Sequence, residues 1–139
     1  MMPFEDATAF FHACETLKGW QGCKQYVADN ASFSAQSEPL ADITTLKDYT
    51  EWMAGFGSTT TIGATYDLHS ASYDESTKTA IFFATYNGTH NGDGGPVPPT
   101  NKTTHSDYVY VLTMNDDGLI KQLVKVWNAP WAMRELGWL

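Results

Sequence analysis

The stretch TTHSDYVYVLTMNDDGLIKQLVKVWN, which spans residues 103–128, decides the fold. Both of its halves are rich in β-branched and aromatic residues, and the segment Asn115-Asp116-Asp117-Gly118 between them is typical of a turn. The pattern predicts two antiparallel strands, 103–114 and 119–128, joined by a tight turn. Gly118 is expected to adopt the left-handed conformation there.

The turn also predicts which residues of the two strands face each other. In the usual three-residue loop, residue 115 faces residue 119, and this register places Asp107 opposite Trp127. Asp107 and Lys125 are then diagonal neighbours on one face, within reach of a salt bridge. The other face is more apolar and ends at Asn128, as expected for the wall of a ligand pocket. It carries Tyr108, Tyr110, Leu112, Met114, Ile120, Val124 and Val126. A simpler interpretation also stays open, in which the tyrosines fill a core and the Asp107–Lys125 pair is solvated.

The rest of the chain divides into helices followed by strands. Two segments, 62–73 and 79–90, have the same strand-like composition and are joined by a turn at 74–77. The N-terminal third instead has apolar residues at helical spacing over 4–17 and over 20–27. Helices that precede an antiparallel sheet indicate the α+β class.

Three local signals complete the expected order of elements. A third helix should run over about 46–56, because Thr45 can cap its first turn. A short C-terminal helix should begin at Pro130 and end at Gly137. Between the second and third helices the pattern is irregular, with a short strand near 31–35.

Composition limits the class of protein. A chain of 139 residues is long enough for a core of its own, so residues 1–139 are expected to form a single domain. Hydrophobic residues make up 42% and charged residues 17%, which argues against disorder. The net charge of −8 repels phosphate backbones, so no nucleic acid is expected as a partner. The five Trp, seven Tyr and seven Phe could line a cavity as well as fill a core.

The sequence also predicts where the protein resides. No run of about 18 apolar residues is present, so no membrane partner is expected. The segment Met1–Asp6 lacks the basic and apolar regions of a signal peptide. Cys14 and Cys23 are therefore expected to stay reduced, and the protein to be cytoplasmic.

Few residues have a spacing that by itself indicates catalysis or metal binding. His105 and Asp107 fall on one face of their strand, where they could bind a metal or form a base and its orienting partner. A metal site needs a third ligand that the sequence does not supply, so no metal is expected. His90 ends the strand over 79–90, but a lone histidine is more often structural or exposed. Trp52 lies on the apolar face of the third helix, where packing in the core is the simpler role.

Several short motifs are spaced as in a known family. The chain contains, in order, Asn87–Gly92, Pro98–Lys102, Asp117–Ile120, Trp127-Asn128 and Leu136-Gly137. This order resembles the C-terminal half of the SnoaL-like polyketide cyclases, which has a Gly-Thr-His-x-Gly strand end, a Pro-Pro-Thr-Gly loop, Asp-Gly-Lys-Ile, a closing acidic residue and a terminal Leu-Gly. The segment Tyr26–Asn30 also resembles the family, so the similarity covers most of the chain.

The resemblance implies a nuclear-transport-factor-2-like, or ketosteroid-isomerase-like, fold. In this cone-shaped fold a curved antiparallel sheet wraps around N-terminal helices and encloses one apolar internal pocket. The fold hosts isomerases, dehydratases and epoxide hydrolases as well as non-enzymatic domains, so it does not by itself define a function. The closing acidic residue of the family corresponds to Asn128, whose amide cannot take up a proton at neutral pH.

Two functions are therefore predicted side by side. The first is an isomerase or cyclase without a cofactor, which acts by proton transfer on a small apolar carbonyl compound. Its catalytic residues would be His90, Asp107 and Asn128, with either His90 or Asp107 as the base. Its substrate-binding residues would be Trp52, Tyr86 and Tyr108. The alternative is a non-catalytic ligand-binding or dimerisation module, which Asn128 in place of the acid favours.

A homodimer is also expected. The helices can cover only the concave face of the sheet, and the convex face keeps apolar residues that a monomer would rarely expose. The residues expected there are Val109, Val111, Leu123 and Trp127.

Overall fold

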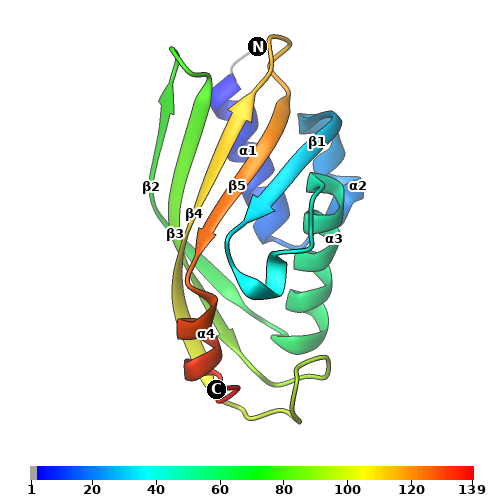
Figure 1. Ribbon diagram of the computed structural model, residues 1–139, viewed down its shortest axis with the longest axis vertical. Helices are drawn as coiled ribbons and strands as arrows, with labels where there is room; N and C mark the ends of the chain where they lie inside the picture. The colour runs from blue at the N-terminus through cyan, green and yellow to red at the C-terminus, as the bar shows by residue number, and fades with distance from the viewer. Residues whose placement is uncertain (1–2) are drawn as a thin grey trace.

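Five strands form one curved, unclosed sheet, which helices cover on one face (Figure 1). The computed structural model describes residues 3–139, so Met1 and Met2 of the segment tested for a signal peptide lie outside the described residues. The sheet order is β1-β5-β4-β3-β2. The strands are β1 (Val27–Ala35), β2 (Thr65–Asp74), β3 (Thr79–Thr89), β4 (Thr103–Met114) and β5 (Ile120–Trp127). The predicted α+β class is confirmed.

Four α-helices and three short helical turns complete the described chain. The helices are α1 (Pro3–Glu15), α2 (Gly19–Cys23), α3 (Leu46–Gly55) and α4 (Ala129–Glu135). The turns are two 3₁₀ segments, Lys24–Tyr26 and Glu38–Leu40, and a π-helical segment, Phe56–Thr60, that continues α3. In Figure 1, α1 lies behind the strands, α3 lies to the right of the sheet, and α4 lies at its lower end. No helix within residues 3–139 has both the length and the hydropathy needed to cross a bilayer.

The sheet is not antiparallel throughout. Its β2–β3, β3–β4 and β4–β5 pairs are antiparallel as predicted, but β1 pairs with β5 in the parallel direction. Most of the chain separates β1 from β5, so no hairpin turn fixes their relative direction. Strand β1 also begins at Val27, and the predicted short strand is therefore the end of a longer one.

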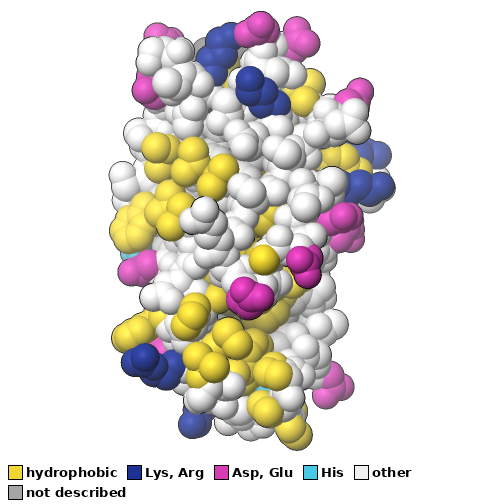
Figure 2. Space-filling model, in the orientation of Figure 1, with side chains coloured by type: hydrophobic (Ala, Val, Ile, Leu, Met, Phe, Trp, Pro, Cys, Tyr) yellow, Lys and Arg dark blue, Asp and Glu magenta, His cyan; other side chains and the backbone are white. Residues whose placement is uncertain are grey.

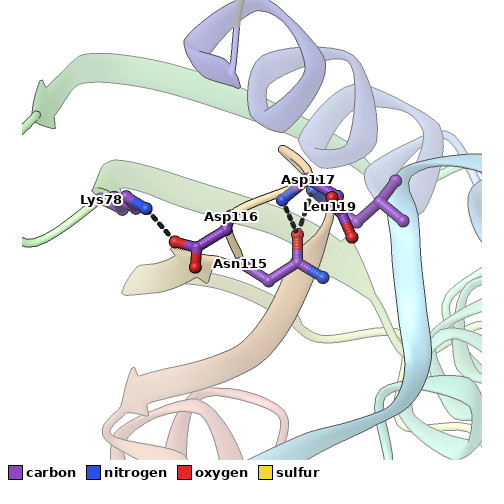
Figure 3. A network of polar contacts seen from close by, with 5 residues as sticks. All are labelled: Lys78, Asn115, Asp116, Asp117 and Leu119. Atoms are coloured by element: carbon purple, nitrogen blue, oxygen red, sulfur yellow. Dashed lines mark hydrogen bonds and ion pairs between the residues drawn. The ribbon is translucent and has the colours of Figure 1, made fainter.

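The turn between β4 and β5 has the predicted form. Gly118 has a φ of 77°, and the side-chain oxygen of Asn115 accepts bonds from the backbone N–H groups of Asp117 and Leu119, each at 2.9 Å. Figure 3 shows this network beside an ion pair between Asp116 and Lys78, which belongs to the β2–β3 turn. Two hairpin turns that are distant in sequence are thus joined at one end of the sheet.

A β-bulge shifts the register of this hairpin. Met114 lies opposite Ile120, as the predicted loop requires, but Thr113 lies opposite Gln122, so Lys121 is an extra residue in β5. One extra residue exchanges the two faces for the remainder of a strand. Beyond the bulge, every predicted pairing is therefore displaced by one residue.

The bulge overturns the expected Asp107–Lys125 salt bridge. Lys125 lies opposite Tyr110, on the face that the helices cover, and it is buried. Asp107 lies on the outer face and is exposed. The two side chains therefore lie on opposite sides of the sheet.

The bulge also exchanges the residues predicted for the two faces of β5. Leu123 was expected on the convex face, but it is fully buried in the core, and Trp127 packs against the core as well. Val124 and Val126, predicted for the pocket wall, lie on the outer face, where Val126 is 58% exposed.

Aromatic rings hold α1 and α3 to the sheet. Phe11 of α1 stacks on Phe82 of β3 with ring centroids 5.0 Å apart and meets Tyr110 of β4 edge-on at 5.3 Å. Tyr49 of α3 stacks on Phe33 of β1 at 4.3 Å. Such pairs add about 0.5–1.5 kcal/mol each beyond the area they bury. The inner face of the sheet is thus fixed against both helices.

The N-cap of α3 provides a test of the fold. The Thr45 hydroxyl accepts a bond from the Asp48 N–H at 3.2 Å, so Thr45→Ala should lower the free energy of unfolding by about 1 kcal/mol. Thr45→Ser keeps the hydroxyl and should lose much less. Urea unfolding followed by circular dichroism measures both; equal losses would contradict the assigned cap.

Candidate functional site

An aromatic pocket lies between α3 and the inner face of the sheet. Its outer cavity has a volume of about 270 Å³ and extends to the C-terminal helix and the loop after β3. A smaller inner chamber of about 20 Å³, room for roughly one water molecule, lies deeper. The two share Trp52, Phe56, Tyr86, Ser106 and Trp127. The inner chamber is also lined by Glu15, Met53, Tyr108 and Lys125.

Local backbone features place Tyr86 in the pocket wall. Its ring lies over Gly88, where an added Cβ would come within 2.7 Å of the Tyr86 ring. Its hydroxyl is 2.7 Å from that of Thr61, which directly follows the π-helical segment that begins at Phe56. Burial raises the pKa of Tyr86 to about 12, so the hydroxyl stays protonated at neutral pH.

Glu15 supplies a buried carboxyl group to the inner chamber. It is the last residue of α1, one helical turn after Phe11, and only 6% of it is exposed. The Tyr108 hydroxyl donates to one of its carboxylate oxygens, and the Tyr110 hydroxyl donates to the other at 2.7 Å. Both carboxylate oxygens thus have a partner in the described chain.

Lys125 places an ammonium group in the wall of the same chamber. Its Nζ atom donates to the Tyr49 hydroxyl at 3.0 Å. Five aromatic rings surround it, with centroids 4.8–5.9 Å away, and cation–π attraction offsets part of the cost of burial. These rings belong to Tyr49, Trp52, Tyr108, Tyr110 and Trp127.

Hydrogen bonds connect the two charged groups through two tyrosines. The Tyr49 hydroxyl, which accepts from Lys125, is in hydrogen-bond contact with the Tyr110 hydroxyl. Tyr110 in turn donates to Glu15. A continuous chain of donors and acceptors therefore runs from the ammonium to the carboxylate.

Burial moves the pKa values of both charged groups toward neutrality. Desolvation raises the pKa of Glu15, although Lys125 and the two tyrosine donors oppose that rise. Desolvation lowers the pKa of Lys125 to about 8, against the opposing effect of Glu15. A lysine that titrates this close to neutral pH, beside a cavity that also holds a carboxyl group of raised pKa, is suited to acid–base chemistry.

The predicted substrate-binding residues lie together. Trp52 and Tyr86 line both cavities, and Tyr108 lines the inner chamber. Trp52 also stacks on Phe56 with centroids 5.1 Å apart, so it contributes to packing and to the pocket wall at once.

His90 is buried outside the pocket lining. Its Nδ1 atom accepts bonds from the Trp138 indole N–H at 3.0 Å and from the Thr100 backbone N–H at 3.3 Å. The ring therefore holds the C-terminus and the long loop together, and Nε2 has no hydrogen-bond partner in the described chain. His90 is not among the residues that line the two cavities.

Asp107 and Asn128 line neither cavity but share a hollow on the surface with Trp131 and with Ser106, which also lines the two cavities. Asp107 accepts a bond from the Thr85 hydroxyl at 2.7 Å, and Asn128 caps α4 by accepting from the Trp131 N–H at 3.2 Å. The structure does not bring these two residues together with His90. Catalytic roles for the three stay predictions.

A metal site is not formed by the acidic, histidine and cysteine side chains of residues 3–139, which contain no group of three close enough to hold an ion. His105 lies on the outer face with Asp107, and its Nδ1 atom is 2.8 Å from the side-chain oxygen of Asn87.

Comparison with known proteins identifies the fold. No family model matches the sequence, and no curated protein matches it. IdmH of Streptomyces antibioticus, a proposed polyketide cyclase, superposes with a TM-score of 0.78 at 13% identity over 99% of both chains. A proposed SnoaL-like polyketide cyclase of Jannaschia sp. CCS1 gives 0.77 at 11% identity over 96% of this chain and 90% of its own. An NTF2-like protein of Burkholderia thailandensis gives 0.75 at 15% identity over 97% of each. The chain has the NTF2-like fold. Superpositions at such low sequence identity establish the fold alone. They confirm the architecture that the sequence resemblance implied.

Within this NTF2-like fold, sequence reasoning missed Glu15 and Lys125. Glu15 follows Phe11 at helical spacing, which was a signal that it shares the buried face of α1. Ile120 and Leu123 are both buried although they are three positions apart, a spacing that places residues of a regular strand on opposite faces, and this indicates a bulge before Lys125.

The lowered pKa of Lys125 predicts a pH-dependent stability. Between its folded pKa of about 8 and the usual lysine value near 10.4, the unfolded chain binds more protons than the folded one. The free energy of unfolding should therefore rise by about 2 kcal/mol from pH 7.5 to 9.5, relative to Lys125→Met. Lys121→Met, on the exposed side of β5, should behave as the wild type does. Urea unfolding at several pH values measures the difference; parallel curves for wild type and Lys125→Met would contradict it.

Proposed function

We propose that the protein catalyses proton transfer on a small apolar carbonyl compound, with Glu15 as the base and Lys125 as the partner of the carbonyl oxygen. One observation carries this proposal: a buried carboxyl group and a buried ammonium group lie together at the inner end of an aromatic pocket. Burying a charged group costs free energy, and buried charged groups beside a cavity are typical of a catalytic or binding site.

The pocket walls favour an apolar ligand with one polar end. Aromatic and aliphatic side chains form most of the outer cavity, whose volume of about 270 Å³ is near the lower end for small-molecule pockets. Of the residues that line these two cavities, the charged ones, Glu15 and Lys125, line the inner chamber and not the outer cavity. A ligand would therefore enter with its carbonyl group first.

The two charged groups have complementary roles in removing a proton beside a carbonyl. Glu15 would accept the proton from the adjacent carbon, and its raised pKa makes it a stronger base than an ordinary carboxylate. The Lys125 ammonium would stabilise the negative charge that develops on the oxygen of the enolate. The names of IdmH and of the Jannaschia protein as proposed polyketide cyclases also support a carbonyl substrate.

Exchange of the ligand's α-hydrogens for deuterium tests this function. Wild-type protein should accelerate exchange into small ketones such as 2-tetralone and 1-indanone in D₂O, as followed by NMR. Glu15→Gln should lower that rate at least 100-fold, while the affinity measured by calorimetry changes less than about threefold.

Glu5→Gln is the matched control, because Glu5 is an exposed residue of the same helix. It should leave exchange unchanged. Unfolding curves for each variant separate loss of activity from loss of structure. Tight ligand binding with no exchange by the wild type would overturn the enzymatic role and favour the non-catalytic binding module.

We also propose that the protein is a homodimer that associates through the outer face of the sheet. Two rows of apolar side chains cross β3, β4 and β5 there, and Figure 2 shows hydrophobic side chains gathered on this face. The rows are Ile81–Val111–Val124 and Phe83–Val109–Val126. Apolar patches of this kind favour burial against a second copy.

A cytoplasmic location is likewise proposed; the free thiols of Cys14 and Cys23 support it.

Light scattering coupled to size exclusion tests the dimer. Wild-type protein should have about twice the 15.4 kDa mass of one chain at micromolar concentration. Phe83→Glu places a charge within the patch and should give the monomer mass. Trp131→Glu, at a residue that is 47% exposed on α4, should remain dimeric. A monomeric wild type would contradict the proposal.

A further inference from the structure

Lys125 differs from an ordinary lysine in what surrounds its amine. No carboxylate oxygen of residues 3–139 lies within 4.0 Å of the Lys125 Nζ atom. Within the described residues, the ion pair at that distance joins Lys78 and Asp116 instead. Its one hydrogen-bond partner in the described chain is the Tyr49 hydroxyl. Lys125 nevertheless lines the inner chamber, so a ligand in the pocket can approach its amine.

A chain of hydrogen bonds provides a path for removing a proton from this amine. Lys125 donates to Tyr49, Tyr49 contacts Tyr110, and Tyr110 donates to Glu15. If each hydroxyl passes its own proton forward as it receives one, the ammonium becomes a neutral amine and the carboxylate becomes a carboxylic acid. The tyrosines end in their original state.

The energetic cost of that transfer is reduced by burial. Desolvation disfavours the charged form of both groups, so it lowers the pKa of Lys125 and raises that of Glu15. With a pKa of about 8, about a tenth of the Lys125 amine is neutral at pH 7, whereas an ordinary lysine has less than about one neutral molecule in a thousand. The neutral amine is the form that acts as a nucleophile.

We propose that Lys125 forms a covalent imine with an aldehyde or an unhindered ketone that enters the pocket. This inference deepens the proposed function and rests on it, because it names the substrate class and the bond that activates it. The positive imine nitrogen then takes the place of the free ammonium in stabilising the charge that develops when Glu15 removes the proton. The narrow inner chamber admits a small carbonyl group, and the outer cavity receives the apolar remainder of the molecule.

The chemical step balances with groups that are present in the chain. The Nζ lone pair attacks the carbonyl carbon, the C–N bond forms, and the π electrons move to the oxygen, which takes a proton from the acid form of Glu15. The nitrogen then returns a proton to Glu15. Glu15 protonates the hydroxyl group, the C–O bond breaks, and water leaves as the protonated imine forms. Its positive nitrogen makes the neighbouring C–H more acidic, and the Glu15 carboxylate removes that proton.

Reductive trapping tests the imine directly. The full chain is incubated with 3-phenylpropanal and sodium cyanoborohydride at pH 7.5, and intact mass spectrometry with peptide mapping locates the adduct. Lys125 should be labelled at least tenfold faster than any other lysine. Lys125→Arg and Lys125→Met should abolish the fast labelling, whereas Lys121→Arg, at an exposed residue of the same strand, should retain it.

Tyr49→Phe tests the proton path, because it removes the first hydroxyl but leaves Lys125 in place. Labelling of Lys125 should slow at least tenfold in this variant; an unchanged rate would overturn the path. Labelling spread evenly over the lysines would overturn the imine itself.

Failure of the imine can be distinguished from failure of the proposed function. Deuterium exchange that survives in Lys125→Met, without any trapped adduct in the wild type, would overturn the imine and leave proton transfer by Glu15 intact. A wild type that neither binds nor exchanges the ketones would overturn both. Circular dichroism and urea unfolding confirm that each variant is folded.

Discussion

The pocket depends on keeping two opposite charges, on Glu15 and Lys125, inside an aromatic core. Moving an ion out of water costs several kcal/mol even after relaxation, and a buried pair is stable only where further hydrogen bonds satisfy it. Tyrosine hydroxyls from α3 and β4 provide those bonds. The positions of helix and strand are therefore tied to the charges, because a shift of either element would leave a charged atom without its partner.

Two backbone features place these charges, and neither depends on a long-range sequence motif. The last turn of α1 places Glu15 above β4, since Phe11 one turn earlier stacks on the sheet. The bulge at Lys121 turns Lys125 inward. Without that extra residue, Lys125 would point to solvent beside Asp107 and Val124 would enter the core. The site thus requires an irregularity in an otherwise regular hairpin.

This requirement explains how much the sequence could predict. Strand β4, the turn at Gly118, the capped helix α3 and the α+β class follow from local patterns, because composition and turn chemistry act over a few residues. The sequence predicted Trp52, Tyr86 and Tyr108 as pocket residues, because aromatic side chains on the inner faces of helix and strand line any cavity left between them. The inward position of Lys125 was not predicted, because the alternation of faces along a strand is counted from its turn and the bulge at Lys121 shifts that count by one residue. Glu15 was missed although its spacing from Phe11 placed it on the buried face of its helix. The parallel pairing of β1 was also missed, since the residues that form it are distant in sequence.

Asn128, at the end of β5, lies outside the charged pocket. Asn128 caps α4, and aspartate would serve that purpose equally well, so capping alone does not account for the amide. Asp107 lines the same hollow, however. A second carboxylate there would repel the first and raise the pKa of at least one of them. The amide keeps the cap without that repulsion, and the buried carboxyl group of this chain lies instead in the inner chamber, where Tyr108, Tyr110 and Lys125 support its charge.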